Sequence, residues 1–330
     1  MAKVLSASSR LRTGLYKTST TLFFTPSKLF EAQMTEIFDE VWPTVTAIKM
    51  LRWQVKGYFE EYCIDNNARL SSKFVEKEDI TNRPNLYRTC IEDTWEDIEY
   101  RIAKNLLTNI FACYEGWAEN ILTLLKRNPR TESINLQSPT TTPRNHQSIL
   151  GDMIAGGNAD LVDAYYDEYR TKCKLHNPVH LDNWFHYYRY FKECRNAIIH
   201  QGGQTTQRVV DAYANIQPLT AADLDVIELP QTFSTSLGEP IKLSLRGVVG
   251  FSQLTIRIVS TLDIEFIKAK HADKYFGKRI LEEVKGRQTI SASPDKKNLQ
   301  IKSLSRKGAF KAPSDKEAAY RVMKAQNVTT

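Results

Sequence analysis

Ten consecutive residues, 194–203, carry the side chains of this chain that are best suited to chemistry. They read CRNAIIHQGG, and apolar residues before and within them recur at three- and four-residue spacing, which predicts the last turns of a helix ended by the glycine pair. On such a helix Asn196 and His200 share a face, while Arg195 lies about 140° round from His200. A guanidinium and an imidazole placed in this way can hold a phosphate group and move a proton beside it.

These residue types suit the cleavage of RNA without a metal ion. The reaction needs a base for the 2′-hydroxyl proton, an acid for the 5′-oxygen leaving group, and a cation for the charge on the phosphorane oxygens. His200 can transfer protons, Arg195 can contact a phosphate through two nitrogens, and Asn196 can bond the phosphate or orient the imidazole. Because one histidine does not easily serve as both base and acid, a dimer that pairs two copies of the motif is favoured. The expected products are a 2′,3′-cyclic phosphate and a 5′-hydroxyl.

The pattern Arg-Asn-x-x-x-His at 195–200 resembles the signature of the HEPN superfamily. Members are helical bundles, and many are metal-independent ribonucleases of prokaryotic toxin–antitoxin, abortive-infection and CRISPR systems, with the motif helices of two protomers facing each other. The resemblance covers about 95–270 and is specific only at 195–203. It implies RNA as substrate, a homodimer, and an antitoxin or other defence-complex protein as partner.

Helical periodicity predicts the elements that position the motif. An apolar stripe that starts near Ser27 continues past Pro43, as one kinked helix or as two. The strongest pattern runs over about 94–127, where Thr94 and Asp97 form a capping box, and it suits the central helix of a bundle. Residues 128–147 are expected to form a long polar loop. Further helices are predicted at about 147–172, with a break near Gly156-Gly157, at 181–200 and at 247–270.

Residues 225–230 and 241–245 alternate apolar and polar side chains around a turn at Leu237–Pro240, which predicts a short hairpin. The expected fold is therefore all-α: a HEPN-like helical bundle with a small β-hairpin insertion before the last core helix. The expected divisions are a basic flexible arm at 1–26, N-terminal helices packing on the bundle at 27–94, the bundle at 95–270, and a basic, mostly flexible tail at 271–330, with short helices at about 272–286 and 314–325.

Glu115 and Glu119 interrupt the apolar helix one turn apart. Similar acidic positions lie near the Arg/His site in several HEPN families, so the resemblance makes Glu115 a candidate to orient Arg195 or His200. Two glutamates spaced in this way also suit a solvated helix face.

Six tyrosines lie within 165–190, just before the motif. Exposed rings can stack on unpaired bases, whereas most aromatic stripes at helical spacing belong to a core. We expect Trp184, Tyr188 and Phe191 to be core residues. The candidate RNA-binding residues are Tyr187, Tyr190, Lys192, Arg306 and Lys307.

The net charge of +7 is concentrated at the two ends of the chain. Residues 1–30 carry five lysines and arginines and no acid, and residues 271–330 carry fourteen against six acids. Basic ends can attract nucleic acid because their cations release counterions from phosphates. The same composition suits solvated, disordered ends, and residues 1–25 also have the acid-poor character of an organellar transit peptide.

Other kinds of protein are disfavoured by what the sequence lacks. It has no apolar run near the roughly 18 residues of a membrane span and no secretory signal, and its five cysteines never form a C-x-x-C pair, so a cytoplasmic protein with reduced thiols is expected. No nucleotide-binding, hydrolase or metalloprotease motif is present. Cys173, His176 and His180 have spacings that hint at a metal, but Pro178 breaks the helix that would present both histidines. We expect no metal and no cofactor.

The sequence therefore predicts a metal-independent endoribonuclease of a prokaryotic defence system, of the abortive-infection or toxin–antitoxin kind. It would cleave RNA by 2′-hydroxyl attack at a composite dimer site. The alternative keeps the fold without the catalysis: a non-catalytic HEPN-like scaffold or sensor that binds nucleic acid or a partner protein.

Overall fold

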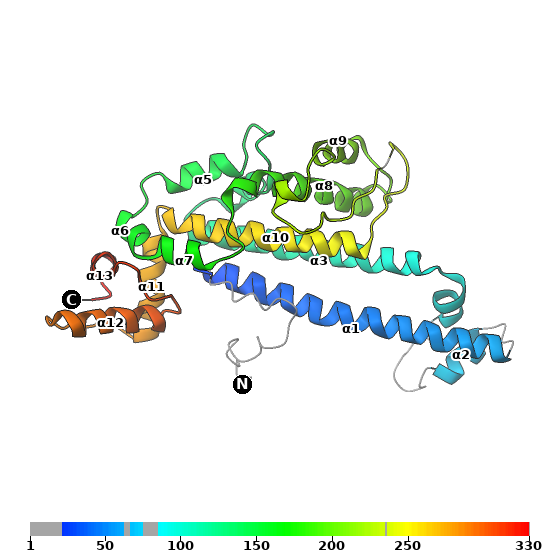
Figure 1. The fold of residues 1–330 in the computed structure, drawn as a ribbon, viewed down its shortest axis with the longest axis horizontal. Helices are drawn as coiled ribbons and strands as arrows, with labels where there is room; N and C mark the ends of the chain where they lie inside the picture. The colour runs from blue at the N-terminus through cyan, green and yellow to red at the C-terminus, as the bar shows by residue number, and fades with distance from the viewer. Residues whose placement is uncertain (1–21, 63–66, 75–84, 235, 330) are drawn as a thin grey trace.

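Four long helices form the frame of the molecule in this computed structural model, which describes residues 22–62, 67–74, 85–234 and 236–329. Helices α3 and α10 run side by side along the middle, with α1 on one side and α8 on the other (Figure 1). Every regular element in these described ranges is helical, which confirms an all-α bundle. The four are α1 (Thr25–Tyr62), α3 (Trp95–Leu124), α8 (Leu181–His200) and α10 (Leu245–Glu265).

Helix α3 is the central element, as its apolar periodicity predicts. The hydroxyl of Thr94 accepts the Asp97 N–H at 3.1 Å and the Asp97 carboxylate accepts the Thr94 N–H at 3.0 Å, so the capping box is confirmed. The helix packs against α1, α8 and α10 and therefore buries more than one face. Its buried stripe includes Leu106, Ile110, Tyr114, Trp117 and Ile121.

Helix α1 is one continuous helix that contains Pro43, so the chain does not divide into two helices there. Its first half packs on the main core. Its far end extends toward α2 (Asn67–Phe74) in Figure 1 and helps to form a second, small core with Leu70, Leu86 and Cys90. The Arg52 guanidinium ties this end to the π-helix at Arg88–Glu92 by donating to the carbonyls of Thr89 and Asp93.

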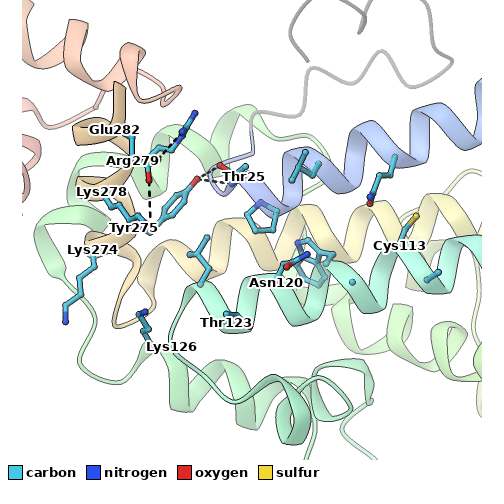
Figure 2. Close-up of a pocket in the computed structure, with 17 residues that line it drawn as sticks. Thr25, Cys113, Asn120, Thr123, Lys126, Lys274, Tyr275, Lys278, Arg279 and Glu282 are labelled. Carbon is cyan, nitrogen blue, oxygen red and sulfur yellow. Dashed lines mark hydrogen bonds and ion pairs between the residues drawn. The ribbon is translucent and has the colours of Figure 1, made fainter. Parts of the chain in front are cut away.

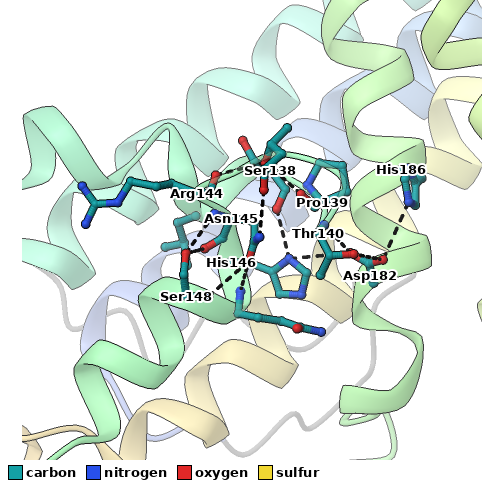
Figure 3. A network of polar contacts seen from close by, with 12 residues as sticks. Ser138, Pro139, Thr140, Arg144, Asn145, His146, Ser148, Asp182 and His186 are labelled. Carbon is teal, nitrogen blue, oxygen red and sulfur yellow. Dashed lines mark hydrogen bonds and ion pairs between the residues drawn. The ribbon is translucent and has the colours of Figure 1, made fainter.

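The segment 128–147 is more ordered than the predicted polar loop. It contains α4 (Pro129–Glu132) and a 3₁₀ turn at Asn135–Gln137, and it leads into α5 (His146–Ile154). Figure 3 shows how it is fastened to the first turn of α8: the Asp182 carboxylate accepts both the N–H and the hydroxyl of Thr140, each at 2.7 Å. Next to this contact, His146 Nδ1 lies 3.0 Å from the Ser138 carbonyl, and burial lowers the pKa of His146. The segment therefore holds the start of the motif helix.

The other connections contain short helices. The predicted helical stretch at 147–172 is present and is interrupted at Gly156, whose φ of +79° suits glycine. After α5 the elements are α6 (Ala159–Leu161), a π-helix at Val162–Tyr166, α7 (Asp167–Lys172), 3₁₀ turns at Pro178–His180, Ala222–Leu224 and Phe266–Lys268, and α9 (Gln207–Ile216).

The predicted β-hairpin is wrong. Within the described residues of 225–245 no strand forms, and the pairing there is an isolated bridge between Gln204 and Pro240. The Ile241 N–H donates to the Gly203 carbonyl at 2.9 Å, so the second half of the expected hairpin runs along the turn that follows the motif. The two halves share no apolar face, because Ile241 is buried while Ile227 is fully exposed.

The prediction of a mostly flexible tail at 271–330 is also wrong for the described residues. The helices expected at about 272–286 and 314–325 are present as α11 (Ala272–Val284) and α13 (Lys316–Ala325), and α12 (Pro294–Lys307) was not expected. Each of these three helices has few apolar residues, but each buries one narrow apolar stripe against the other two helices. Side chains of the main core from this region include Phe276, Ile280, Ile301, Phe310 and Val322.

The ordered body also begins earlier than Ser27. Residues 1–21 of the predicted arm lie outside the described residues, but Leu22, Phe23 and Phe24 are buried in the core. The Asp263 carboxylate on α10 accepts the N–H groups of Phe23 and Phe24 at 2.6 and 3.1 Å. Burial raises the pKa of Asp263 to about 6 although these bonds oppose it. Among the described helices, none has the length and apolarity needed to cross a membrane.

Candidate active site

The motif occupies the last turns of α8, where the helix turns back toward α9. The N–H groups of Gln201 and Gly203 both donate to the Ala197 carbonyl, at 2.9 and 3.1 Å. Gly202 and Gly203 have φ values of +63° and +81°, a conformation that glycine adopts without strain. Buried Val209, Ala212 and Ile216 then hold α9 against α8. The glycine pair thus ends the motif helix and directs the next helix back alongside it.

The three motif residues lie together but face two sides. Arg195 Nη1 donates to Asn196 Oδ1 at 3.1 Å, which joins the guanidinium to the amide. Asn196 and exposed His200 line a groove of about 540 Å³, whereas Arg195 does not line it. Arg195 Nε is buried and has no hydrogen-bond partner in the described structure. A buried N–H without a partner is costly, so the Arg195 guanidinium would gain a hydrogen bond by turning toward an acceptor in the groove, such as a phosphate oxygen.

The groove has a second wall that sequence reasoning missed. Helix α9 and the residue before it contribute Thr206, Gln207 and Arg208, of which Gln207 and Arg208 are exposed. Arg208 also lines a neighbouring cavity of about 170 Å³ with His186 and Arg189. The signal in the sequence was an arginine at the start of an amphipathic helix directly after the glycine turn. Its place beside His200 depends on the direction in which α9 returns.

A second histidine on the same helix does not complete the site. His186 lies fourteen residues before His200 on α8, which corresponds to about 21 Å along a helix axis. Two histidines that far apart cannot act on one phosphate. Burial also lowers the pKa of His186, which lies 3.7 Å from the Asp182 carboxylate. His186 therefore belongs to the network that fastens α8.

Glu115 is half-buried on α3 and lies in the same neighbourhood as Arg195. The side chains of both act electrostatically on Tyr188 and Lys192 of α8. No hydrogen bond or ion pair joins Glu115 to Arg195 or His200 within the described residues. Glu119 is exposed, as the solvated-face interpretation predicts for that residue.

The two candidate stacking residues are buried. Tyr187 and Tyr190 are 2% and 1% exposed, so the prediction that their rings stack on bases is wrong. Burial raises the pKa of Tyr187 to about 12, and the Tyr190 hydroxyl donates to the Phe233 carbonyl at 3.4 Å. The apolar stripe of α8 is wider than the sequence alone indicates because 229–233 and α9 cover its second side. The core prediction is confirmed for Trp184, Tyr188 and Phe191.

The three predicted RNA-binding cations do not gather at the motif. Lys192 is half-buried, and its ammonium donates to Gln137 Oε1 at 2.6 Å. Burial lowers the pKa of Lys192, although the nearby Glu115 carboxylate opposes this. Arg306 and Lys307 are exposed at the end of α12, which lies at the opposite end of the molecule from α9 (Figure 1).

The residues that hinted at a metal have structural partners instead. His176 Nε2 lies 2.8 Å from a Glu265 carboxylate oxygen, and His180 Nδ1 lies 2.8 Å from the Asp223 carbonyl. Cys173 is buried. In the part of the chain that the structure describes, no three His, Cys, Asp or Glu side chains gather in a way that could hold a metal ion.

Comparison of the chain with protein-family models, with curated proteins and with solved structures found no match. The HEPN-like interpretation is therefore carried by the motif at the end of α8 and by the all-helical surround.

Proposed function

We propose that this chain is a metal-independent endoribonuclease of a prokaryotic defence system, with a HEPN-like site at the end of α8. The observation that supports this most directly is the groove that Asn196, His200 and Arg208 line together. Arg195 is bonded to Asn196 beside that groove and has a buried N–H without a partner in the described structure. Metal-independent RNA cleavage needs proton transfer, which an imidazole can supply, and a cation for the phosphate charge, which a guanidinium can supply.

The proposed reaction proceeds by attack of the 2′-oxygen on the adjacent phosphorus. His200 accepts the 2′-hydroxyl proton, the new P–O2′ bond forms, and the P–O5′ bond breaks. The leaving 5′-oxygen takes a proton from the protonated His200 of a second copy. Arg195 holds the non-bridging oxygens, whose charge grows in the transition state, and Arg208 contacts a neighbouring phosphate of the RNA backbone. The products are a 2′,3′-cyclic phosphate and a 5′-hydroxyl.

The exposed end of α8 offers the second copy a place to bind. Ile199, next to His200, is 46% exposed although it is a large apolar residue. A homodimer that brings two α8 ends together would cover this side chain and place the two histidines near one phosphate. A ribonuclease of this kind also requires control, and an antitoxin or other defence-complex protein is the proposed partner.

Cleavage of labelled RNA in the presence of EDTA tests the proposal. His200→Ala should reduce the rate about 100-fold to 10,000-fold, since a proton-transfer group is lost. Arg195→Ala should reduce it about 100-fold to 1,000-fold, since a transition-state cation is lost. Both proteins should keep the wild-type circular dichroism spectrum. Arg144→Ala is the matched control because Arg144 is exposed and lies outside the groove.

An unchanged cleavage rate in either motif variant would contradict the assignment of the ribonuclease site to Arg195 and His200. Light scattering after size exclusion provides the second readout: an active protein that is monomeric at assay concentration would contradict the composite site. Wild-type protein that binds RNA without cleaving it, with binding that survives His200→Ala, would instead support the non-catalytic scaffold.

A further inference from the structure

A large cavity lies between the start of α1, the second half of α3 and the start of α11 (Figure 2). Its volume is about 820 Å³, and none of its lining residues belongs to the groove at the motif. Pockets of roughly 300–1,000 Å³ typically hold small molecules. The cavity is therefore large enough for a ligand that the ribonuclease proposal does not use.

One part of the cavity wall is apolar. Leu29 of α1 is 52% exposed, and Trp117 and Leu124 of α3 line the same cavity. The Trp117 Nε1–H donates to Ser27, so the indole needs no polar partner from a ligand in the cavity. Burial raises the pKa of Cys113, so the thiol that lines this part is neutral. This wall suits a ligand with an apolar body.

The other part is strongly cationic. Lys126, Lys274, Lys278 and Arg279 line it, and Glu282 is the one acid among the described lining residues. Figure 2 shows these labelled cations on the α11 side, away from Cys113. Arg279 is paired with Glu282 at 3.2 Å, and Lys278 lies 3.8 Å from the same residue. The ammonium groups of Lys126 and Lys274 have no ion-pair partner within the described residues.

We propose that this cavity binds an amphiphilic anion, a small molecule with an apolar body and a phosphate or carboxylate head. The body would lie against Leu29 and Trp117, and the head would be held by Lys126 and Lys274. The chain's own residues 1–21 are a poor alternative occupant, because they carry four lysines and arginines and no acid. Like charges would repel that segment from the cationic end.

Glycine 116 offers a way to fill the cavity without touching its charges. Gly116 lies on α3 in the cavity wall, and a Cβ added there would meet nothing within 4 Å. Leucine at this position keeps the helix and projects into the empty space. Gly57 on α1 is the matched control, since its Cβ would also meet nothing and it lies outside this cavity.

Calorimetric titration with decyl phosphate below its micellar concentration tests the proposal, with decanoate, decanol and inorganic phosphate as further probes. Decyl phosphate or decanoate should bind, and the stronger of the two identifies the head group. Decanol and inorganic phosphate should each bind at least about tenfold more weakly, because each lacks one of the two recognition elements.

Lys126→Gln and Lys274→Gln should each weaken binding of the anionic amphiphile roughly tenfold, since each removes a charged hydrogen-bond donor. Gly116→Leu should abolish binding, while Gly57→Leu should leave it unchanged. Lys242 is exposed and lies outside the cavity, so Lys242→Gln should also leave binding unchanged. The lysine variants are at exposed positions and keep the test valid if Gly116→Leu does not fold. Equal binding of decanol, equal binding to both lysine variants, or no binding of either anionic amphiphile would overturn the proposal.

Discussion

At the scale of single residues, the three polar side chains of the motif differ in their exposure to solvent, and this difference suits them to different roles. Asn196 and His200 are open to the groove, while Arg195 is half-buried and partly without partners in the described structure. Arg208 of α9 adds an exposed cation to the lining of the same groove. We infer that Arg195 serves the reacting phosphate and that Arg208 positions the RNA backbone.

Arg208→Ala should therefore change substrate binding more than the chemical step. We expect KM to rise about fivefold to tenfold while kcat falls less than about threefold, and the slope of log affinity against log salt to decrease by roughly one phosphate contact. Cleavage kinetics at several salt concentrations provide the measurement. Arg144→Ala again serves as the control. A fall in kcat as large as that of Arg195→Ala would show that Arg208 belongs to the reacting centre.

At the scale of elements, the α8–α9 connection decides whether a groove exists at all. The motif helix ends where Gly202 and Gly203 take left-handed conformations, and the turn is then pinned by the bond from Ile241 N–H to the Gly203 carbonyl. The wall that carries Arg208 depends on this reversal.

Gly202→Ala should lower the free energy of unfolding by about 1 kcal/mol, because a Cβ is strained at positive φ. Nothing lies within 4 Å of the added Cβ, so the cost is conformational rather than steric. Gly57→Ala, in a helix with ordinary φ, should instead stabilise by about 0.5 to 1 kcal/mol. Urea denaturation of wild type and the two variants measures both changes in the free energy of unfolding. A Gly202→Ala protein as stable as wild type would contradict the role given to this turn.

At the scale of the whole molecule, the first and last parts of the described chain belong to one body. Phe23, Phe276 and Phe310 pack together, with ring centroids 4.8 Å apart for Phe23–Phe310 and for Phe276–Phe310. Asp263 of α10 accepts two backbone N–H groups at the start of the described chain. The buried carboxylate thus joins the N-terminal segment to the central bundle.

This contact should give stability an unusual pH dependence. Burial raises the pKa of Asp263 to about 6, so the folded state binds a proton there before the unfolded state does. Protonation of Asp263 should therefore raise the free energy of unfolding as pH falls from about 7 to about 4, by an amount on the order of 3 kcal/mol. Urea denaturation of wild type and Asp263→Asn across this range should show that the free energy of unfolding of wild type rises relative to that of the variant as pH falls.

Glu265, two residues further along α10, provides the opposite control. Burial alone would raise the pKa of Glu265, but hydrogen bonds from His176, Lys268 and Tyr166 outweigh it and lower the pKa to about 2. The stabilisation that Glu265 gives the folded state should therefore be constant above about pH 4.5 and be lost as pH falls toward 2.

For Asp263, the contradicting outcome is a free energy of unfolding that changes with pH in the same way in wild type and in Asp263→Asn.

The sequence by itself determined the local elements. The capping box at Thr94, the apolar stripe of α3 and the glycine stop of α8 depend on neighbours three or four residues apart, so periodicity and capping chemistry were sufficient. The sequence also placed Arg195, Asn196 and His200 on one helix end, because their spacing sets their angles. It predicted α11 and α13 as short helices without showing that they join the core.

Only the tertiary structure decided what covers each helix. Tyr187 and Tyr190 are buried because 229–233 and α9 fold over them, and Arg208 reaches the motif for the same reason. Residues 225–245 form no hairpin within their described part, because Ile241 pairs with the turn at Gly203 rather than with its expected partner strand. Contacts between residues distant in sequence carry no periodic signal, since they depend on how whole helices pack. For that reason the sequence could supply the catalytic candidates but not the groove that surrounds them.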